Sequence, residues 1–568
     1  MVLLILLVAG LVSAKCFEPT IAHPPPIYDP HDALLQEAFG SIDAALTVAV
    51  AAPEFASTSF SVEVTSSKET LWSQHHTARE RNASRPDIPH VNGDALYRIA
   101  SITKTFTVLG LLYQHAAGNL SLDDTVNKYL PELGDKSDGG TPWKDITLRS
   151  LASQLSGLPR DWAQSDIINA HIDPTEFGLP PNVSREGLPE CDEWSPNYET
   201  PCTAQDLYKI VQTYRPLFAP NQLSTYSNIA YELLGLVLSR VTNRTYEAYI
   251  HDAIFTPLNM THSTLSIPPD TTGVIPLNPQ FWDVDEGVQN PTGGIYSSSS
   301  DMSKYLRYIL THYNALTPAL NWLHPHSASR GTNSFYGMPW EILHTDRVLL
   351  DSRRSVRFVT KSGGLPGYTS IVILAPEYDI GITILVAGPP SSLFSTIREI
   401  VSVQLIRAAE LVAMSQLDRR YAGTYRALDD DARLNSSMVI RADRRGLVVT
   451  QLISNSSGVF EALASKGLVP ERWYAQISPT LLFRNEREKA GEEWRLLIVE
   501  ERAEGVGAVW DEFCAEDYDG LDAYAGVPLG EVVFWGDGVV ELSAFRVNLT
   551  RVEDGNGFAD GEQERMEL

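Results

Sequence analysis

Strand-like patterns on both sides of a long helical block are the feature that most limits how this chain can fold. Residues 58–64 alternate in the manner of a strand, and 369–375 with 380–387 have the pattern of a hairpin. Between them, about 120–344 is mostly helical pattern broken by long loops. We therefore predict an α/β fold in which one sheet, flanked by helices, is interrupted by an inserted helical domain.

The C-terminal part of the chain has a different pattern. The chain has 568 residues, enough for more than one domain. We place the first domain at 30–415. Short strand-like runs separated by Gly, Asn and charged turns then predict a β-rich domain at 416–552. Residues 553–568 form an acidic tail that we expect to be disordered.

The N-terminus has the pattern of a secretory signal. Residues 2–14 are apolar and end in the small-x-small pattern of Val12-Ser13-Ala14. This segment is shorter than the roughly 20 apolar residues that cross a bilayer, and no later run is predicted to cross one. We expect residues 1–14 to be a cleaved signal peptide and the protein to be secreted.

Cysteines and glycosylation sequons also favour the secretory route. The four cysteines could form two disulfide bonds in an oxidising compartment. Cys191 with Cys202 would close a local loop and leave Cys16 to pair with Cys514, and the other pairings stay open. Asn-x-Ser/Thr sequons, which accept N-glycans in secreted proteins, occur at Asn82, Asn119, Asn182, Asn243, Asn259, Asn435, Asn455 and Asn548.

Composition and missing motifs exclude several functions. The 71 acidic side chains outnumber the 44 Lys and Arg, and the net charge of -27 argues against nucleic acid as a partner. The pairs His75-His76 and His324-Pro325-His326 lack the ligand spacing of a metallo-hydrolase, so we expect no metal. Walker, dinucleotide-glycine and Gly-x-Ser-x-Gly patterns are also absent from the sequence, and we expect no cofactor.

A serine stands three residues before a lysine at the start of an apolar run. Ser101 and Lys104 begin the helix-like segment 101–117, so both side chains would share one face of the helix. The positive end of the helix would favour an alkoxide and lower the pKa of a nearby lysine. We interpret Ser101 as a nucleophile, although Ser-x-x-Lys alone is also the pattern of a helix cap followed by a solvated lysine.

Two further motifs strengthen this interpretation. Tyr226-Ser227-Asn228 lies in a turn before a predicted helix, where Asn228 is also a reasonable N-cap, and Lys361-Ser362-Gly363 is placed at the end of a strand. Together with Ser101 they predict a serine acyl-transfer site, in which Lys104, Tyr226 and Lys361 handle protons. Positive charges near Tyr226 would lower its pKa below about 10.

These three motifs resemble those of the serine β-lactamase and penicillin-binding-protein family, in particular its class C β-lactamase-related esterase branch. The resemblance covers about residues 30–412. It implies an antiparallel sheet flanked by helices, and a secreted fungal protein with a C-terminal β-rich extension. Three other segments also resemble that branch: Leu155-Ser156-Gly157-Leu158-Pro159, Pro291-Thr292-Gly293-Gly294-Ile295-Tyr296-Ser297-Ser298 and Gly363-Gly364-Leu365-Pro366-Gly367-Tyr368.

The resemblance implies a role for each residue. Ser101 would form an acyl-enzyme, Lys104 and Tyr226 would share the role of base, Asn228 would orient substrate, and Lys361 would support Tyr226. The substrate-binding strand would contribute Gly363 and Gly364, with the backbone N–H groups of Ser101 and Gly364 as the oxyanion hole.

Two departures from the family pattern make antibiotic hydrolysis less expected. Gln154 stands where relatives often have histidine, and Ser362 replaces a common threonine. We therefore expect a secreted serine hydrolase or transesterase acting on a small ester, lactone or amide. The alternatives are a β-lactamase or D-amino-acid peptidase, and a non-catalytic ligand-binding protein on the same fold.

Overall fold

The chain divides into two compact units. A computed structural model describes residues 21–134, 140–162, 167–169, 173–181, 184, 186, 188, 191, 200–278, 281–316, 320–389, 392–427, 435–501 and 521–552. The first unit holds 29–345 and 356–406. The second holds the chain from 407 onward, and it also includes 346–355 and the described residues up to Tyr28. The sequence patterns do not indicate that these two short segments belong with the C-terminal part.

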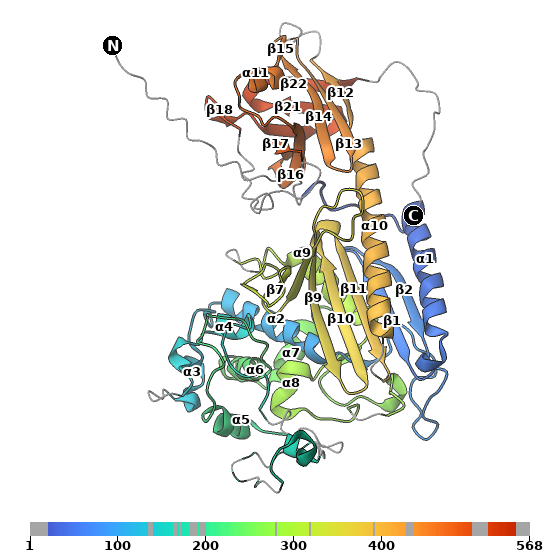
Figure 1. The fold of residues 1–568 in the computed structure, drawn as a ribbon, viewed down its shortest axis with the longest axis vertical. Coiled ribbons are helices and arrows are strands. Elements are labelled where there is room, and N and C mark those ends of the chain that lie inside the picture. Colours follow the sequence, from blue (N-terminus) through green and yellow to red (C-terminus); the bar gives the residue numbers. More distant parts are fainter. Residues whose placement is uncertain are drawn as a thin grey trace. The chain divides into compact units, whose positions relative to one another are not determined.

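An eight-stranded antiparallel sheet forms the centre of the first unit (Figure 1). Segments from both ends of this unit meet in it, because β1 pairs with β11. The strand order is β2 (Thr70–His76), β1 (Ser59–Thr65), β11 (Ile380–Ala387), β10 (Tyr368–Ala375), β9 (Val356–Leu365), β8 (Glu341–Thr345), β7 (Ser334–Tyr336) and β6 (Ser327–Ala328).

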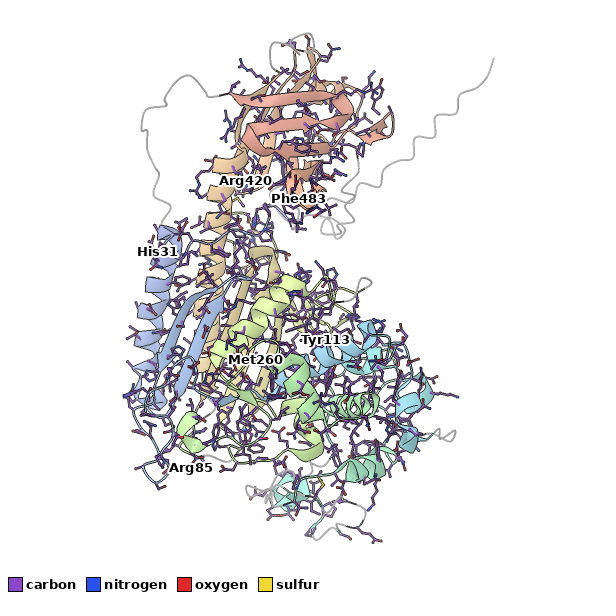
Figure 2. The ribbon with its side chains drawn as sticks, turned by 180° about the vertical axis from the view of Figure 1, so that it is seen from behind. His31, Arg85, Tyr113, Met260, Arg420 and Phe483 are labelled. Carbon is purple, nitrogen blue, oxygen red and sulfur yellow. A yellow bond between two sulfur atoms is a disulfide. The ribbon has the colours of Figure 1, made fainter. Side chains whose placement is uncertain are left out.

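Burial explains the sequence pattern of the strands. Every residue of the central strand β11 is buried, as expected for a continuous apolar run covered on both faces. Helix α10 (Leu393–Tyr421) begins in the first unit, where its part up to Ile406 lies on one face of the sheet, and α9 (Ser299–His312) lies on the other face (Figures 1 and 2). Helix α1 (Ala33–Val50) packs beside β2, where the ring of Phe39 stacks on that of Trp72 with centroids 5.7 Å apart.

Helices fill the part of the first unit that the sequence predicts to be helical. Helix α2 is buried at each of its first ten residues, which explains why its sequence is apolar on nearly every side. Helices α6, α7 and α8 pack against α2, and α3 and α4 pack against α6. The helices of this part are α2 (Thr103–Ala116), α3 (Val126–Tyr129), α4 (Leu148–Ala152), α5 (Ala204–Val211), α6 (Ile229–Thr242), α7 (Tyr246–Ile250) and α8 (Asn290–Gly293).

The predicted fold class is confirmed, and two details differ from the sequence patterns. Strands β6, β7 and β8 lie within the predicted helical block and extend the main sheet, while β3 (Tyr97–Arg98), β5 (Tyr296–Ser297) and β4 (Ser263–Thr264) form a small second sheet. The Lys361 motif lies inside β9 rather than at the end of a strand. These short strands are defined by their pairing partners, which a local pattern does not reveal.

The second unit is a β-barrel formed by a nine-stranded sheet. Eight of the strands close into the barrel because β13 pairs with both β12 and β14, and β15 pairs with β14 alone. Helix α11 (Val459–Ser465) follows β15 in the chain. The strand order is β13 (Ser437–Asp443), β12 (Gly423–Arg426), β22 (Val547–Val552), β21 (Val539–Leu542), β20 (Glu531–Trp535), β17 (Ala490–Glu500), β16 (Trp473–Asn485), β14 (Gly446–Ser454) and β15 (Ser457–Gly458).

Several predictions fall outside the described residues. They are the signal peptide, the acidic tail, and the side chains of Cys16, Cys514 and Asn182. The disulfide bond between Cys191 and Cys202 is present. Of the other seven sequons, Asn82 is half-buried, and the exposed asparagines are Asn119, Asn243, Asn259, Asn435, Asn455 and Asn548.

Among the residues that the structure describes, two helices are long and apolar enough to cross a membrane, α1 and α10. The sequence prediction had expected no such run after the N-terminus. In α1 the buried side chains recur every three or four residues, from Leu35 and Phe39 to Leu46 and Val50. This spacing is that of a helix with one face against a core, and it explains the apolar composition without a bilayer.

We expect the barrel core to depend on Trp494. Its buried ring makes edge contacts with Tyr421 and Phe534, at centroid distances of 4.9 and 5.5 Å. The change Trp494→Ala should destabilise the second unit by roughly 3–5 kcal/mol, because it leaves a large cavity. Hydrogen exchange of the barrel strands measures the loss. The matched control is Trp535→Ala, since Trp535 is partly exposed, and equal losses in both variants would contradict the prediction.

Candidate active site

Ser101 lies in a tight turn that leads into α2. Residues Ala100–Ile102 form a 3-10 turn directly before the helix. Ala100 has a φ of 48°, a left-handed conformation that costs energy for a residue with a Cβ and is found at functional sites. The turn is tied to the main sheet, because the hydroxyl of Ser370 donates to the carbonyl of Ile99 at 2.8 Å.

Lys104 is buried one helical turn from Ser101. Its Nζ is 3.0 Å from Oγ of Ser101 and 2.9 Å from the carbonyl oxygen of Thr292. Burial lowers the pKa of Lys104 because an ammonium group is poorly solvated there, and the nearby charge of Lys361 acts in the same direction. A lysine with a lowered pKa next to a hydroxyl can accept its proton.

Gln154 holds the segment that carries Tyr226. The N–H of Ser227 donates to Oε1 of Gln154 at 2.7 Å, and the N–H of Thr225 donates to its backbone carbonyl at 2.9 Å. Gln154 is fully buried and has a φ of 63°. The residue that departs from the family pattern therefore fixes the position of Tyr226. The sequence analysis marked Gln154 only as a departure and did not predict this contact.

Tyr226 brings the three motifs together. The Nζ atoms of Lys104 and Lys361 lie 5.2 and 5.1 Å from the centroid of its ring. Burial alone would raise the pKa of Tyr226, but the charges of Lys104 and Lys361 and a hydrogen bond with Ser101 lower it below its ordinary value. The phenol group is thus suited to giving up a proton.

Lys361 has an acidic partner that the sequence analysis missed. Its Nζ donates to Oε1 of Glu341, on the neighbouring strand β8, at 2.6 Å. Oε2 of Glu341 accepts from the backbone N–H and the hydroxyl of Ser362. Burial lowers the pKa of Lys361, but the attraction to Glu341 outweighs it and the net pKa is raised. Only the pairing of β8 with β9 identifies this partner.

Asn228 occupies the N-cap position of α6, yet its side chain does not cap the helix. Its Nδ2 donates to Oδ1 of Asp161, and its backbone N–H donates to the carbonyl oxygen of Arg160 at 2.7 Å. The amide is therefore held beside Tyr226 by the loop that follows α4.

Gly363 lies against the turn of Ser101. A Cβ at this position would be 2.3 Å from the carbonyl oxygen of Ile99 and 3.1 Å from the backbone nitrogen of Ser101, so only glycine fits. Gly364 comes next on β9 and has open space on its Cα. The close approach at Gly363 places this part of β9 beside the backbone N–H of Ser101.

A buried carboxyl group, Glu232, lies on α6 near the site. Its Oε2 accepts from the indole N–H of Trp162 at 2.9 Å, and its Oε1 has no hydrogen-bond partner among the described residues. Burial raises the pKa of Glu232 to about 8, so the group is protonated at neutral pH.

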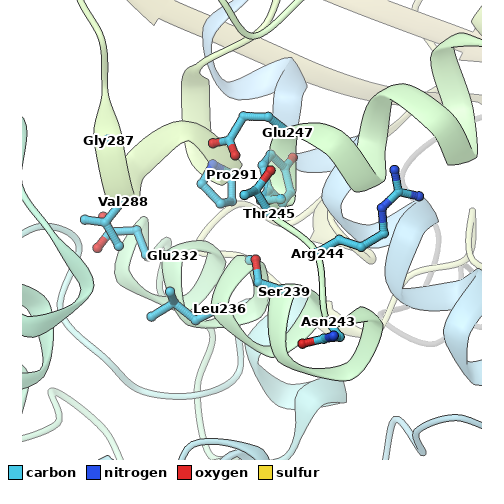
Figure 3. A pocket seen from close by; sticks show the side chains of 12 residues that line it. Glu232, Leu236, Ser239, Asn243, Arg244, Thr245, Glu247, Gly287, Val288 and Pro291 are labelled. Carbon is cyan, nitrogen blue, oxygen red and sulfur yellow. The ribbon is translucent and has the colours of Figure 1, made fainter.

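The cavity beside α6 is not the predicted site. It has a volume of about 510 Å³ and is lined by Glu232, Ser239, Asn243, Arg244, Glu247 and Pro291, among others (Figure 3). None of the predicted catalytic residues lines it, so we locate the site by its chemistry. Among the described residues no group of three or more His, Cys, Asp or Glu side chains could hold a metal ion.

Glu232 should make stability depend on pH. In the unfolded chain its pKa is near 4.5, and in the folded protein it is about 8. As pH rises from 4.5 to 8 the unfolded state alone loses the proton, so stability falls by up to about 1.4 kcal/mol per pH unit. Thermal unfolding at several pH values measures this change. Between about pH 5 and 8 the free energy of unfolding should decrease less for Glu232→Gln than for wild type. The exposed Glu471→Gln should behave like wild type, and parallel curves for all three would contradict the prediction.

Two protein families match the two parts of this chain. Residues 54–404 match the Beta-lactamase family, and residues 413–553 match the family described as Beta-lactamase-like-like, C-terminal domain. A Probable hydrolase M10 from Phoma sp. is 32% identical over 94% of this chain and 91% of its own length.

Two further relatives align with most of the chain. A Probable hydrolase clz13 from Cochliobolus lunatus is 31% identical over 96% of this chain and 93% of its own length. A Beta-lactamase-like protein from Arthroderma benhamiae is 29% identical over 87% of this chain and 86% of its own length. A solved class C beta-lactamase has 18% identity and a TM-score of 0.47, covering 66% of this chain and 98% of the other. The chain belongs to the beta-lactamase family of hydrolases, with the C-terminal domain of beta-lactamase-like proteins.

Proposed function

We propose that this protein is a secreted serine hydrolase that forms an acyl-enzyme on Ser101. The observation that carries the proposal is the contact of 3.0 Å between Nζ of the buried Lys104 and Oγ of Ser101, with Tyr226 beside both. A serine hydroxyl needs a base within hydrogen-bonding distance, and this arrangement supplies two candidate groups.

The first half of the reaction makes the acyl-enzyme. Oγ of Ser101 attacks the acyl carbonyl carbon while its proton passes to the Lys104–Tyr226 pair. The carbonyl oxygen becomes an oxyanion, which the backbone N–H groups of Ser101 and Gly364 stabilise by roughly 3–4 kcal/mol each. The intermediate collapses, the bond to the leaving group breaks, and the pair returns the proton to the leaving alcohol or amine.

The second half of the reaction releases the acyl group. Water, or a second alcohol, loses its proton to the same pair and attacks the carbonyl carbon of the ester on Ser101. The bond to Oγ then breaks and Oγ recovers the proton. The lowered pKa of Tyr226 suits a group that accepts and returns a proton near neutral pH.

We assign the substrate to small esters, lactones or amides. Two relatives that align over nearly the whole chain are probable hydrolases. Gln154 and Ser362, the two departures from the lactamase pattern, both belong to the network around Tyr226 and Lys361. These features favour ester chemistry over β-lactam hydrolysis.

Secretion is part of the proposal. It is supported by the apolar N-terminal segment, by the Cys191–Cys202 disulfide bond and by six sequons with exposed asparagines. Mass spectrometry of the protein secreted by a eukaryotic host, before and after glycosidase treatment, should show a mature N-terminus near Lys15 and loss of glycan mass.

The Ser101 acyl-enzyme can be tested directly. A fluorophosphonate probe should add one label at Ser101 of the wild type and none to Ser101→Ala. The variant Ser224→Ala removes a serine two residues before Tyr226 and should still be labelled. With 4-nitrophenyl acetate, Tyr226→Phe should lower kcat/KM by roughly 10²- to 10⁴-fold, since it removes a proton acceptor. Labelling of Ser101→Ala equal to wild type would exclude the mechanism.

The pair of Lys361 and Glu341 should set the alkaline limit of activity. In Glu341→Gln the buried Lys361 loses the anion that keeps it protonated, so its pKa falls. Because the site needs this charge to hold the pKa of Tyr226 low, the alkaline limb of kcat/KM against pH should move to lower pH. At neutral pH a loss of roughly 10- to 100-fold is expected, as for one hydrogen bond to a charged group. Glu341→Asp should keep part of the activity, and an unmoved alkaline limb in Glu341→Gln would contradict the assignment.

A further inference from the structure

A third cation lies over the ring of Tyr226. The Cζ of Arg160 is 5.0 Å from the ring centroid, within the range of a cation–π contact. The side chain of Arg160 is 69% exposed, whereas Lys104 and Lys361 are fully buried. Of these three cations, Arg160 is the one that a dissolved molecule can reach.

Arg160 is fixed by its backbone to the site. Its carbonyl oxygen accepts from the N–H of Asn228 at 2.7 Å, and the carbonyl oxygen of the preceding Pro159 accepts from the hydroxyl of Ser227, also at 2.7 Å. Both donors belong to the segment that carries Tyr226. The guanidinium is therefore attached to a rigid part of the site rather than to a separate surface loop.

The guanidinium keeps unused donors. Its Nε is 3.2 Å from Oδ2 of Asp161, while the other oxygen of Asp161 accepts from the amide of Asn228. Within the described parts of the chain, the two terminal amino groups of Arg160 form no hydrogen bond. Two parallel N–H donors in a planar fork match the two oxygens of a carboxylate.

From this arrangement, and resting on the proposed function, we propose that Arg160 binds a carboxylate of the substrate. The protein would then act on acyl compounds that carry a free carboxylate near the bond to be cleaved. Arg160 is a specificity residue in this scheme, because it contacts a part of the substrate that does not react.

The test uses esters that differ only in charge. One pair is 4-nitrophenyl hydrogen glutarate and its methyl ester, with the carboxylate on the acyl side. The second is 4-acetoxybenzoate and its methyl ester, with the carboxylate on the alcohol side. Wild type should prefer the free acid over the methyl ester in at least one pair, and that pair identifies the side of the substrate that Arg160 binds.

In Arg160→Gln, kcat/KM for the preferred acid should fall roughly 10- to 100-fold, mainly through KM, as for loss of a charge-assisted hydrogen bond. The value for its methyl ester should stay within about twofold. Arg160→Lys should keep part of the preference. Arg441→Gln, at an exposed arginine of the barrel, should match wild type.

Two results would overturn the proposal. The first is the absence of any preference in both pairs. The second is a change in Arg160→Gln that the acid and its methyl ester share, either an equal loss of kcat/KM or the same shift of the pH profile. Such a shared change would mean that Arg160 acts through Tyr226 rather than on the substrate.

Binding separates failure of this proposal from failure of the proposed function. In Ser101→Ala, ligand-observed NMR with monomethyl glutarate and with 4-acetoxybenzoate measures affinity without turnover. The double variant with Arg160→Gln should bind one of these ligands at least tenfold more weakly. This result would support the carboxylate site even if wild type hydrolysed none of the four esters. Equal affinity with and without Arg160 for both ligands would overturn it, whether or not the esters are hydrolysed.

Discussion

The ion pair between Lys361 and Glu341 is the interaction on which the site depends. Moving a lysine side chain into a protein interior costs several kcal/mol unless an anion and hydrogen bonds compensate. Glu341 provides the anion at 2.6 Å, and its second oxygen binds the backbone of Ser362, so β8 and β9 are also joined at this point. With this charge fixed, Tyr226 faces one permanent cation and one lysine, Lys104, that can lose its proton.

The two lysines therefore have different surroundings and different roles. Lys361 has the carboxylate of Glu341 as its partner, while Lys104 contacts the oxygens of Ser101 and Thr292 and lies beside Tyr226. Burial lowers the pKa of both lysines, yet the net pKa is raised in Lys361 and lowered in Lys104. One cation stays charged and tunes Tyr226, and the other is free to take the proton of Ser101. The separation follows from one carboxylate on a neighbouring strand.

The sequence predicted the elements with strong periodicity and the motif residues that the fold brings together in the proposed site. Strand β11 and the first ten residues of helix α2 are rich in apolar side chains and are buried, so their patterns indicate burial directly. Glu341 could not be predicted, because its role depends on the register of a five-residue strand, and Gln154 was noticed only as a departure. The left-handed backbone of Gln154 and the hydrogen bond that it accepts from Ser227 depend on the tertiary fold, and no local pattern contains them. Contacts between segments far apart in the sequence decide both positions.

The acidity of the chain affects this site less than its nearest neighbours do. Charges in solution are screened beyond about 8 Å at physiological ionic strength, whereas a buried pair at 2.6 Å is hardly screened. The net charge of -27 therefore leaves Lys361 and Tyr226 to their direct partners. It does act on molecules that approach from solution, and it disfavours anions. An anionic substrate needs a local cation at the mouth of the site, and Arg160 is the exposed one beside Tyr226.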